Sequence, residues 1–409
     1  MQSNHPSPGP VTLAERILFI DILRGMALFG ILAANMRSFF APIDAYDHIQ
    51  VLFPGRADRI AQGFIDIFIQ GKFISIFSFL FGLGFAMQMS RAEARGVSFL
   101  GFYPRRLIAL GCFGLIHGML IWSGDILLTY ALAGGILLLF RHREQKTLLY
   151  WAAGLFSAPI VLSTGFFAAY ELGFRRPWMI PPKPDLHKLH DIINIYAHGS
   201  LAQIMKQNLV EWKDELPLEL FAFYAVGLFL LGMWVWRARI VQNLDQYRDF
   251  LKKFCAWCLT IGFLGSLYVG LAKAFIPPAT ITVWARIAGM IWLPSSHILA
   301  AGYVSGLALI YLRPGTHPAL RPFAAVGRMA LTNYLMQSIL CTWFFYSFGT
   351  GLYGQVGPAQ GLIFTAVLYT AQLILSNWWL SRYRFGPMEW LWRGLTYGSF
   401  PVMRPAVSG

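Results

Sequence analysis

Ten long apolar stretches, separated by short charged or Pro/Gly-rich segments, constrain this chain more than any other feature. A helix needs about 20 predominantly apolar residues to cross the hydrocarbon core of a bilayer. Because lipid offers the backbone no hydrogen-bond partners, apolar stretches without strand-like alternation must be helical there. The stretches lie at 17–40, 60–90, 103–122, 124–140, 147–170, 217–236, 254–276, 287–311, 329–348 and 359–381. The sequence therefore predicts an all-α polytopic transmembrane helix bundle of about ten helices.

Composition supports a membrane protein and excludes a nucleic-acid partner. Of the 409 residues, 56% are hydrophobic and only 13% are charged, which is outside the usual range of soluble domains. The net charge of +14 comes from Lys and Arg scattered among short loops, whereas nucleic-acid binding needs a concentrated basic surface. The four cysteines lie inside apolar stretches, which predicts helix packing. The expected partner is the lipid bilayer, and glycine-rich helices also permit a homo-oligomer.

The distribution of Lys and Arg predicts the orientation of the bundle, because short cytoplasmic loops retain basic residues. Most of them fall on one face, together with both ends of the chain, so both termini are expected in the cytoplasm and the long polar segment outside. We expect location in a bacterial cytoplasmic (inner) membrane. The predicted parts are a short cytoplasmic tail (1–16), a first five-helix half (17–170), an extracytoplasmic polar segment (171–216), a second five-helix half (217–381) and a cytoplasmic interfacial C-terminal segment (382–409).

Polar residues inside the first apolar stretch are the first candidates for a functional site, because ionisable groups in a membrane usually face a partner, a cavity or a substrate. Asp21 and Arg24 are three residues apart, and Asn35 follows nearly three full turns after Arg24. All three therefore share one face of a helix. They form either a buried ion pair that fixes packing or, with Asn35, the wall of a hydrated path.

Lys72 follows a Gln-Gly pair inside the second stretch and has two interpretations. Its ammonium group either extends to the outer interface or points inward as a cation for an anionic substrate. Asp66 can neutralise it only if the helix breaks at Gly71.

The turn between the third and fourth stretches combines His117 with Asp125. A histidine beside a carboxylate can act as nucleophile or general base while the carboxylate sets its tautomer. The alternatives are a structural histidine and a simple helix N-cap at Asp125. His297 follows two serines and is a second, weaker candidate, because no carboxylate lies near it in the sequence.

Further candidates lie at the predicted cytoplasmic edge. Arginines there can bind phosphate, but the positive-inside rule alone also places arginine at this edge. Glu389 and Arg393 are spaced by one turn in a Trp-rich segment that alone reads as an interfacial helix. The candidates at this edge are Arg105, Arg106, Arg328, Asn333, Glu389 and Arg393.

Taken together, these motifs are similar to those of the YeiB-like family of bacterial membrane proteins, which is classed as a domain of unknown function. The resemblance covers nearly the whole chain. The motifs are Ile20-Asp21-Ile22-Leu23-Arg24-Gly25 with Asn35, Gly71-Lys72-Phe73 leading to Phe81-Gly82-Leu83-Gly84, Arg105-Arg106, Gly124-Asp125-Ile126-Leu127, Gly327-Arg328 with Leu331-Thr332-Asn333-Tyr334, and Gly386-Pro387-Met388-Glu389-Trp390 with Trp392-Arg393.

The resemblance implies a distant relationship to membrane acyltransferases such as the lysosomal heparan-alpha-glucosaminide acetyltransferase. These enzymes take an acetyl group from cytoplasmic acetyl-CoA and deliver it to an amino sugar on the far side. Asp21, Arg24, Gly25 and Asn35 match their first-helix motif. Their acceptor-side histidine has two competing counterparts here, His48 and His117.

The expected function is therefore transfer of an acyl group from cytoplasmic acyl-CoA, as co-substrate, to a small-molecule or glycan acceptor outside. No permanently bound cofactor and no metal are expected. His117 is the expected base, Asp125 orients it, and Asn35 or Lys72 stabilises the oxyanion. The alternative is a transporter or exporter of an anionic or amphipathic metabolite that uses Arg24 and Lys72 as binding charges without covalent chemistry.

Overall fold

The computed structural model describes residues 17–43, 45, 49–174, 185–215, 220–276 and 282–404, and this part of the chain is built from helices. Each of the ten apolar stretches holds a helix. His48 lies outside the described residues. The main helices are α1 (Leu18–Phe40), α3 (Arg56–Phe64), η2 (Ile65–Ile69), α4 (Lys72–Ala94), α5 (Tyr103–Ile116), η4 (His117–Ile121), α6 (Leu127–Leu137), α7 (Gln145–Glu171), α8 (Leu186–His198), α9 (Leu201–Glu215), α10 (Leu220–Arg237), α11 (Arg248–Phe275), α12 (Val283–Tyr311), α13 (His317–Arg328), α14 (Ala330–Phe345), α15 (Pro358–Leu380) and α16 (Pro387–Tyr397).

Seven helical segments in the described part of the chain are long and apolar enough to cross a membrane. They are Leu18–Phe40, Arg56–Ala94, Phe99–Ile121, Gln145–Glu171, Val241–Phe275, Val283–Tyr311 and Pro358–Leu380. Leu127–Phe140 and Phe223–Arg237 are shorter apolar helices. The all-α membrane bundle is confirmed, and the number of helices that cross the bilayer stays a prediction.

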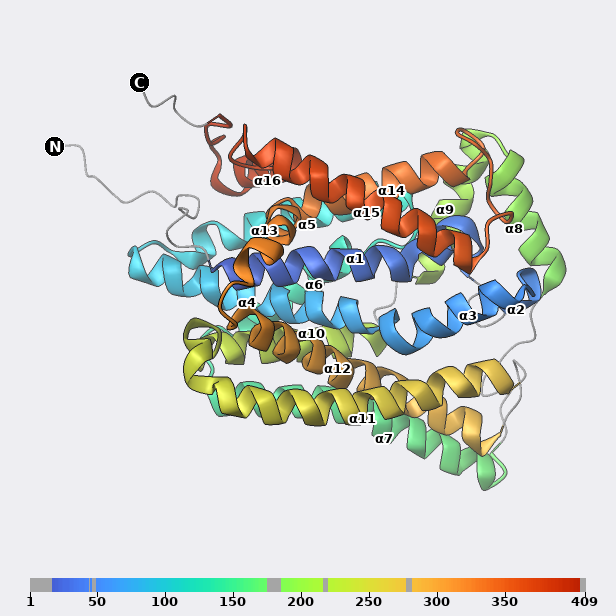
Figure 1. Ribbon diagram of the computed structural model, residues 1–409, viewed down its shortest axis with the longest axis horizontal. Coiled ribbons are helices and arrows are strands. Elements are labelled where there is room, and N and C mark those ends of the chain that lie inside the picture. The colour runs from blue at the N-terminus through green and yellow to red at the C-terminus, as the bar shows by residue number, and fades with distance from the viewer. Residues whose placement is uncertain are drawn as a thin grey trace.

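The long helices run side by side along one direction, with α1 near the centre (Figure 1). Helix α1 packs against α4, α13, α14 and α15, α4 packs against α10, and α11 packs against α12. Helix α7 lies at the edge with most of its side chains exposed, as expected for a lipid-facing helix. The core therefore forms around α1 and α4, which also carry most of the membrane-embedded candidates.

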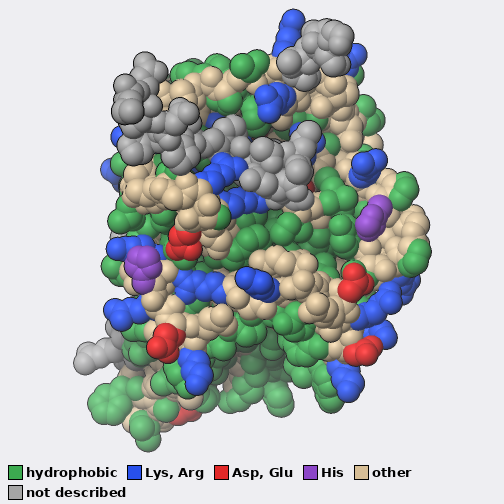
Figure 2. Space-filling model, turned by 90° about the vertical axis from the view of Figure 1, so that its left-hand side faces the viewer, with side chains coloured by type: hydrophobic (Ala, Val, Ile, Leu, Met, Phe, Trp, Pro, Cys, Tyr) green, Lys and Arg blue, Asp and Glu red, His purple; other side chains and the backbone are tan. Residues whose placement is uncertain are grey.

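The two ends of the bundle differ in what covers them. Helices α8 and α9, from the predicted extracytoplasmic segment, lie across one end, whereas α16 and the start of α1 lie at the other (Figure 1). Figure 2 looks onto the end with α16, where Lys and Arg side chains are spread over the face and Asp and Glu are sparse. The cytoplasmic location of this basic end stays a prediction.

Helix α13 was not predicted, because its amphipathic sequence lacks a long apolar stretch. It crosses α1 where two glycines meet: a Cβ on Gly25 would lie 2.0 Å from the Phe323 carbonyl oxygen, and one on Gly327 would lie 1.9 Å from that of Asp21. The backbones are therefore in direct contact. Arg328 ends this helix, so Gly327 and Arg328 of the quoted motif belong to α13 and not to the ninth apolar helix, because α14 begins at Ala330.

Candidate functional site

A cavity of about 250 Å³ enters the bundle between α1, α4, α5, α6, α13, α14 and α16. It begins at the basic end of the molecule and reaches towards the middle of the bundle. Its polar lining consists of Asp21, Arg24, Gln88, Arg91, Arg106, Arg328, Glu389 and Arg393. Its apolar lining includes Leu28, Ile31, Phe77, Leu80, Phe81, Leu110, Ile126 and Leu127, with Tyr130 and Tyr334. The cavity thus joins a cationic mouth to an apolar interior.

The mouth brings together six of the predicted site residues from four separate helices or their ends. Arg24 Nη1 donates to Asp21 Oδ1 over 3.1 Å, and both side chains line the cavity, so the pair is a wall group as well as a packing contact. The Arg106 guanidinium lies 3.5 Å from the ring centroid of Trp392, whose indole donates to the Arg106 carbonyl. This stacking fixes the direction of the guanidinium. The six residues are Asp21, Arg24, Arg106, Arg328, Glu389 and Arg393.

Glu389 connects α16 to the start of α14. Its carboxylate accepts the backbone N–H groups of Leu331, over 2.6 Å, and of Thr332, over 3.1 Å, together with the Thr332 hydroxyl. A carboxylate at a helix N-terminus satisfies amides that have no partner within the helix. Burial raises the pKa of Glu389 above its usual range, and the hydrogen bonds from Thr332 and Leu331 offset part of that rise. The residue therefore anchors the wall of the mouth.

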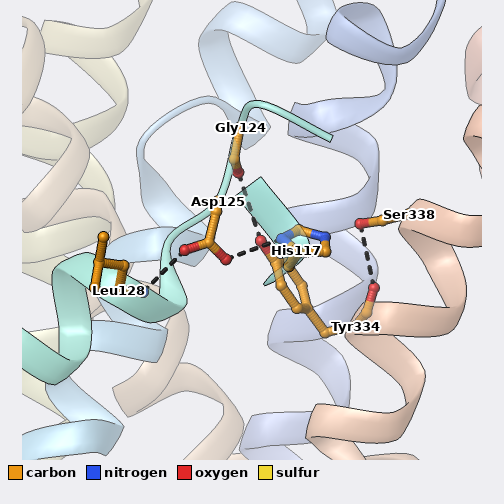
Figure 3. A network of polar contacts seen from close by, with 6 residues as sticks. All are labelled: His117, Gly124, Asp125, Leu128, Tyr334 and Ser338. Atoms are coloured by element: carbon orange, nitrogen blue, oxygen red, sulfur yellow. Dashed lines mark hydrogen bonds and ion pairs between the residues drawn. The ribbon is translucent and has the colours of Figure 1, made fainter. Parts of the chain in front are cut away.

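His117 and Asp125 form a buried pair beyond the inner end of the cavity. His117 Nδ1 lies 2.9 Å from Asp125 Oδ1, and Asp125 Oδ2 accepts the backbone N–H of Leu128 over 2.9 Å. Figure 3 shows Asp125 reaching both the amide of Leu128 and the ring of His117. Asp125 is therefore both the helix cap and the partner of the histidine, so the two predicted interpretations hold together.

The Asp125 carboxylate also decides which nitrogen of His117 is available for chemistry. When the carboxylate is ionised it only accepts hydrogen bonds, so a neutral imidazole beside it carries its proton on Nδ1 and keeps the lone pair of Nε2. Nε2 is buried without a hydrogen-bond partner in the described part of the chain. A carboxylate-oriented imidazole with one free basic nitrogen is the arrangement used in general base catalysis.

Tyr334 separates the cavity from His117. It lines the cavity, its ring centroid lies 5.1 Å from that of His117, and its hydroxyl lies 3.5 Å from the Gly124 carbonyl oxygen. Figure 3 shows the two rings together beside the turn that carries Asp125. Trp122 also packs against the histidine, with ring centroids 6.0 Å apart, and its indole N–H is buried without a partner among the described residues. It is a free donor close to the imidazole.

Helix α9 covers this pair from the end opposite to the mouth. Trp212 lies against Gly118 so closely that a Cβ there would be 2.3 Å from its indole nitrogen. The Ser123 hydroxyl donates to Glu211 over 3.1 Å, and the Tyr196 hydroxyl donates to the same carboxylate oxygen over 3.1 Å. The predicted extracytoplasmic segment is thus a helical cap above the His117 turn.

Besides His117 and Asp125, four predicted site residues do not line the cavity. Arg105 is exposed although its neighbour Arg106 lines the mouth. Asn35 lies one turn beyond Ile31 on the same stripe of α1, past the last α1 residue of the lining. Asn333 is buried and donates to the Val326 carbonyl and to Ser376, which places it in the packing between helices. Lys72 is the fourth.

Lys72 is fully buried rather than extended to the interface, and it belongs to a different cluster. The helix breaks at Gly71, whose φ of 81° is in the left-handed region. This break brings Asp66 and Lys72 together, which an unbroken helix would not allow. Lys72 Nζ donates to the Asp66 carbonyl oxygen over 2.8 Å. His297, the weaker histidine candidate, lies on α12 and meets α4 one turn beyond Lys72, with Nδ1 2.7 Å from the Ser75 hydroxyl.

Sequence reasoning missed several residues of the cavity and its inner end. Tyr334 was part of a quoted motif and Trp122 lies three residues before Asp125, but neither had an assigned role, because aromatic residues are common in apolar stretches. Gln88 and Arg91 come from the C-terminal part of α4, one and two helical turns beyond the small-residue motif that ends at Gly84. The available signal was their stripe with Phe81 and Gly84 on one face of that helix.

Comparisons with known proteins give a consistent family. The model of the family described as "Protein of unknown function (DUF418)" matches residues 235–399. The chain is 37% identical to the uncharacterized protein YxaH of Bacillus subtilis, covering 96% of each chain. It is 30% identical to the uncharacterized protein YeiB of Escherichia coli, covering 93% of this chain and 96% of that one. It is also 29% identical to an uncharacterized 39.9 kDa protein from the amylase 3' region of Bacillus acidopullulyticus, covering 96% of this chain and 98% of that one. With full-length similarity at this level, the chain belongs to the YeiB-like, DUF418 family of membrane proteins.

Proposed function

We propose that this protein transfers an acyl group from a cytoplasmic acyl-CoA to a hydroxyl or amine acceptor on the opposite side of the membrane. The observation that carries the proposal is one cavity with an arginine-rich mouth and an apolar interior, which ends against a tyrosine that touches a buried His-Asp pair. Arginine is the side chain best suited to bind phosphate groups, and an apolar interior suits an acyl chain and its thioester.

In this proposal the mouth holds the phosphates of the donor. Arg106, Arg328 and Arg393 come from three helices and line the same opening, so they can contact several phosphate oxygens at once. The pantetheine arm then extends along the apolar wall towards Tyr334. Because Tyr334 separates the cavity from the histidine, its side chain must rotate before the thioester carbonyl reaches His117.

The His117 imidazole acts as the base in the transfer step. Nε2 takes the proton from the acceptor as the acceptor oxygen or nitrogen bonds to the thioester carbon. The carbon–sulfur bond then breaks, and the sulfur receives the proton from Nε2, so atoms and charge balance. The Trp122 indole N–H can donate to the carbonyl oxygen as it becomes negative, a role for which a single donor is worth about 3 kcal/mol.

The direct test is acyl-CoA binding to the detergent-purified protein, measured by calorimetry and by thermal shift with acetyl-, succinyl- and long-chain CoA. Replacing one phosphate-binding arginine, Arg328→Ala, is expected to weaken binding about 10-fold or more, since a hydrogen bond to a charged group contributes about 1.5–3 kcal/mol. Arg105→Ala is the matched control, because Arg105 is exposed outside the cavity. Equal affinities for both variants, or no CoA binding by folded wild-type protein, would refute the proposal.

A second candidate function is transport of an anionic or amphipathic metabolite. The observation that favours it is the helix broken at Gly71 beside the buried Lys72, because membrane carriers commonly bind substrates at discontinuous helices. Counterflow of a labelled metabolite in proteoliposomes tests it. Flux that persists in the double variant His117→Ala, Asp125→Asn would identify a carrier, whereas acyl transfer without flux would exclude this candidate.

A further inference from the structure

The break between η2 and α4 is surrounded by buried polar groups that the proposed acyl transfer does not use. Gln62 is 3% exposed, Asp66 is 8% exposed and Lys72 is 0% exposed. The cavity lining on α4 begins only at Phe77, so this cluster is separate from the acyl-donor site. Ionisable groups placed inside a membrane protein are costly and usually serve a ligand or a relay.

Some of the polar groups near Gly71 bond to the backbone carbonyls that the helix break leaves without partners. The carbonyl of Phe68 accepts the Tyr303 hydroxyl over 3.1 Å, and that of Gln70 accepts the Ser296 hydroxyl over 3.4 Å. Helix α12 therefore satisfies the backbone that the break exposes. A lysine is not needed for this purpose, because neutral hydroxyl groups already perform it.

The ammonium group of Lys72 has more hydrogen-bond donors than the described structure uses. It carries three protons, and in the described part of the chain it donates to one acceptor, the Asp66 carbonyl oxygen. Two charged groups act on it with opposite sign, the carboxylate of Asp66 and the ammonium of Lys273. Lys72 also begins α4, where the positive end of the helix dipole adds to its own charge. These features favour an anion.

The same cluster holds unused acceptors. Gln62 Nε2 donates to Asp66 Oδ2 over 3.0 Å, which fixes the amide so that Gln62 Oε1 points away from that carboxylate. Gln62 Oε1 and Gln70 Oε1 are buried without a hydrogen-bond partner in the described residues. Buried polar atoms of this kind normally have partners, so a donor belongs beside them.

We infer that the groups around the Gly71 break form a second binding site, for a small anion that also carries a hydroxyl group. Lys72 binds the anionic group, and the Gln62 carbonyl accepts the hydroxyl. Because Lys72 is fully buried, the ligand enters when α3 and η2 move relative to α4, with Gly71 between the two helices as the flexible residue. Hydroxycarboxylate and hydrogen phosphate share this chemistry.

Thermal shift titrations of the full-length detergent-purified protein with sodium lactate, propionate and phosphate, against sodium chloride, test the inference. We expect saturable stabilisation by lactate and binding of lactate about 2- to 10-fold tighter than that of propionate, the range that one net hydrogen bond supplies. Phosphate alone in place of lactate would identify the natural anion as a phosphate. Equal, non-saturating shifts with every salt would overturn the inference, since that is a general salt effect.

Two variants assign the roles. Lys72→Met is expected to abolish saturable binding of all three anions, and Gln62→Leu is expected to make lactate and propionate equal. Lys252→Met is the control, because Lys252 is an exposed lysine paired with Asp249. Unchanged binding in Lys72→Met would refute the site. CoA binding is measured in the same samples, so failure of this site and failure of the acyl-donor site are distinguished.

A further measurement needs no variant. Lactate is expected to slow hydrogen exchange in wild-type residues 62–75, because ligand binding closes the segment that must open. No change there at saturating lactate would overturn the inference even if a substituted protein did not fold.

Discussion

The most consequential contact at the residue scale is the one between His117 and Asp125. The carboxylate holds Nδ1 and also caps α6 through Leu128, so its position is fixed from two sides. A base held in this way loses no free energy to reorientation during the reaction. The pair lies on a short hairpin, which is why the sequence alone predicted it.

We expect His117→Gln to abolish acyl transfer and leave acyl-CoA binding within about 2-fold of wild type. The reason is that His117 lies beyond the cavity and acts only on the transferred group. Asp125→Asn is expected to lower kcat by about 10³- to 10⁴-fold, as in other enzymes that lose the residue that orients the histidine. Turnover is measured with radiolabelled acetyl-CoA in proteoliposomes. Wild-type turnover in His117→Gln would exclude the histidine as the base.

Trp122→Phe tests the predicted donor to the carbonyl oxygen. Removal of its N–H is expected to lower kcat about 10²- to 10³-fold with little change in KM, because the hydrogen bond strengthens only as negative charge develops. The control is Trp151→Phe, an exposed tryptophan on the lipid-facing α7. A rise in KM at constant kcat would show that Trp122 contributes to ground-state binding instead.

The sequence predicted contacts between residues that are close in the chain and missed contacts between residues of distant segments. Asp21 with Arg24, and His117 with Asp125, are close in the chain, and both pairs form. Tyr334 meets His117 only because α14 packs beside η4, a contact that no short-range pattern encodes. Lys72 could be placed only once the break at Gly71 was known, since an unbroken helix would hold Asp66 away from it.

At the element scale, helix α14 depends on Glu389, which lies 57 positions beyond Thr332 in its first turn. Glu389 accepts three hydrogen bonds from Leu331 and Thr332, and it also lines the mouth. The apolar pattern predicted α14 but not this anchor. It placed Glu389 on an interfacial helix with Arg393, because one-turn spacing was the only local signal.

Glu389→Ala is expected to lower the free energy of unfolding by about 1–2 kcal/mol, the usual cost of losing a helix cap. Thermal unfolding in detergent, followed by circular dichroism, measures it. Glu144→Ala is the matched control, because Glu144 occupies the N-cap position of α7 without a side-chain capping bond. Equal effects of the two substitutions would argue against the anchoring role.

The crossing of α1 and α13 gives a second prediction at this scale. Gly327→Ala places a methyl group 1.9 Å from the Asp21 carbonyl oxygen, so the helices must separate, and we expect a loss of about 1–3 kcal/mol. In Gly154→Ala, the added methyl group meets nothing within 4 Å, and helix propensity alone predicts unchanged or slightly higher stability. The two melting temperatures provide the comparison.

For the whole molecule, the apolar stretches were sufficient to predict an all-helical membrane bundle, because the bilayer fixes the length and backbone hydrogen bonding of anything that crosses it. They did not reveal α13, or that part of the long polar segment folds into α8 and α9. Those elements are amphipathic and depend on the surfaces they cover. The cavity cannot be recognised in the sequence either, because seven helices contribute to it.

Cysteine labelling tests the orientation of the bundle. In a Cys112→Ser background, Thr350→Cys is expected to react with a membrane-impermeant maleimide in intact cells, because Thr350 is exposed at the end covered by α8. Ser381→Cys, exposed at the other end of α15, should react only after permeabilisation. The reverse pattern would place the basic mouth outside the cell and remove access of cytoplasmic CoA.

The cavity described above ends at Ile31, Ile126 and Tyr334, while α9 covers the histidine from the other end of the bundle. Between the two lies a plug of packed side chains. A donor site of the kind proposed would pass a covalent group across the bilayer without forming a continuous water-filled pore. Under that proposal, cytoplasmic metabolites would modify molecules outside the membrane while the proton gradient stays intact.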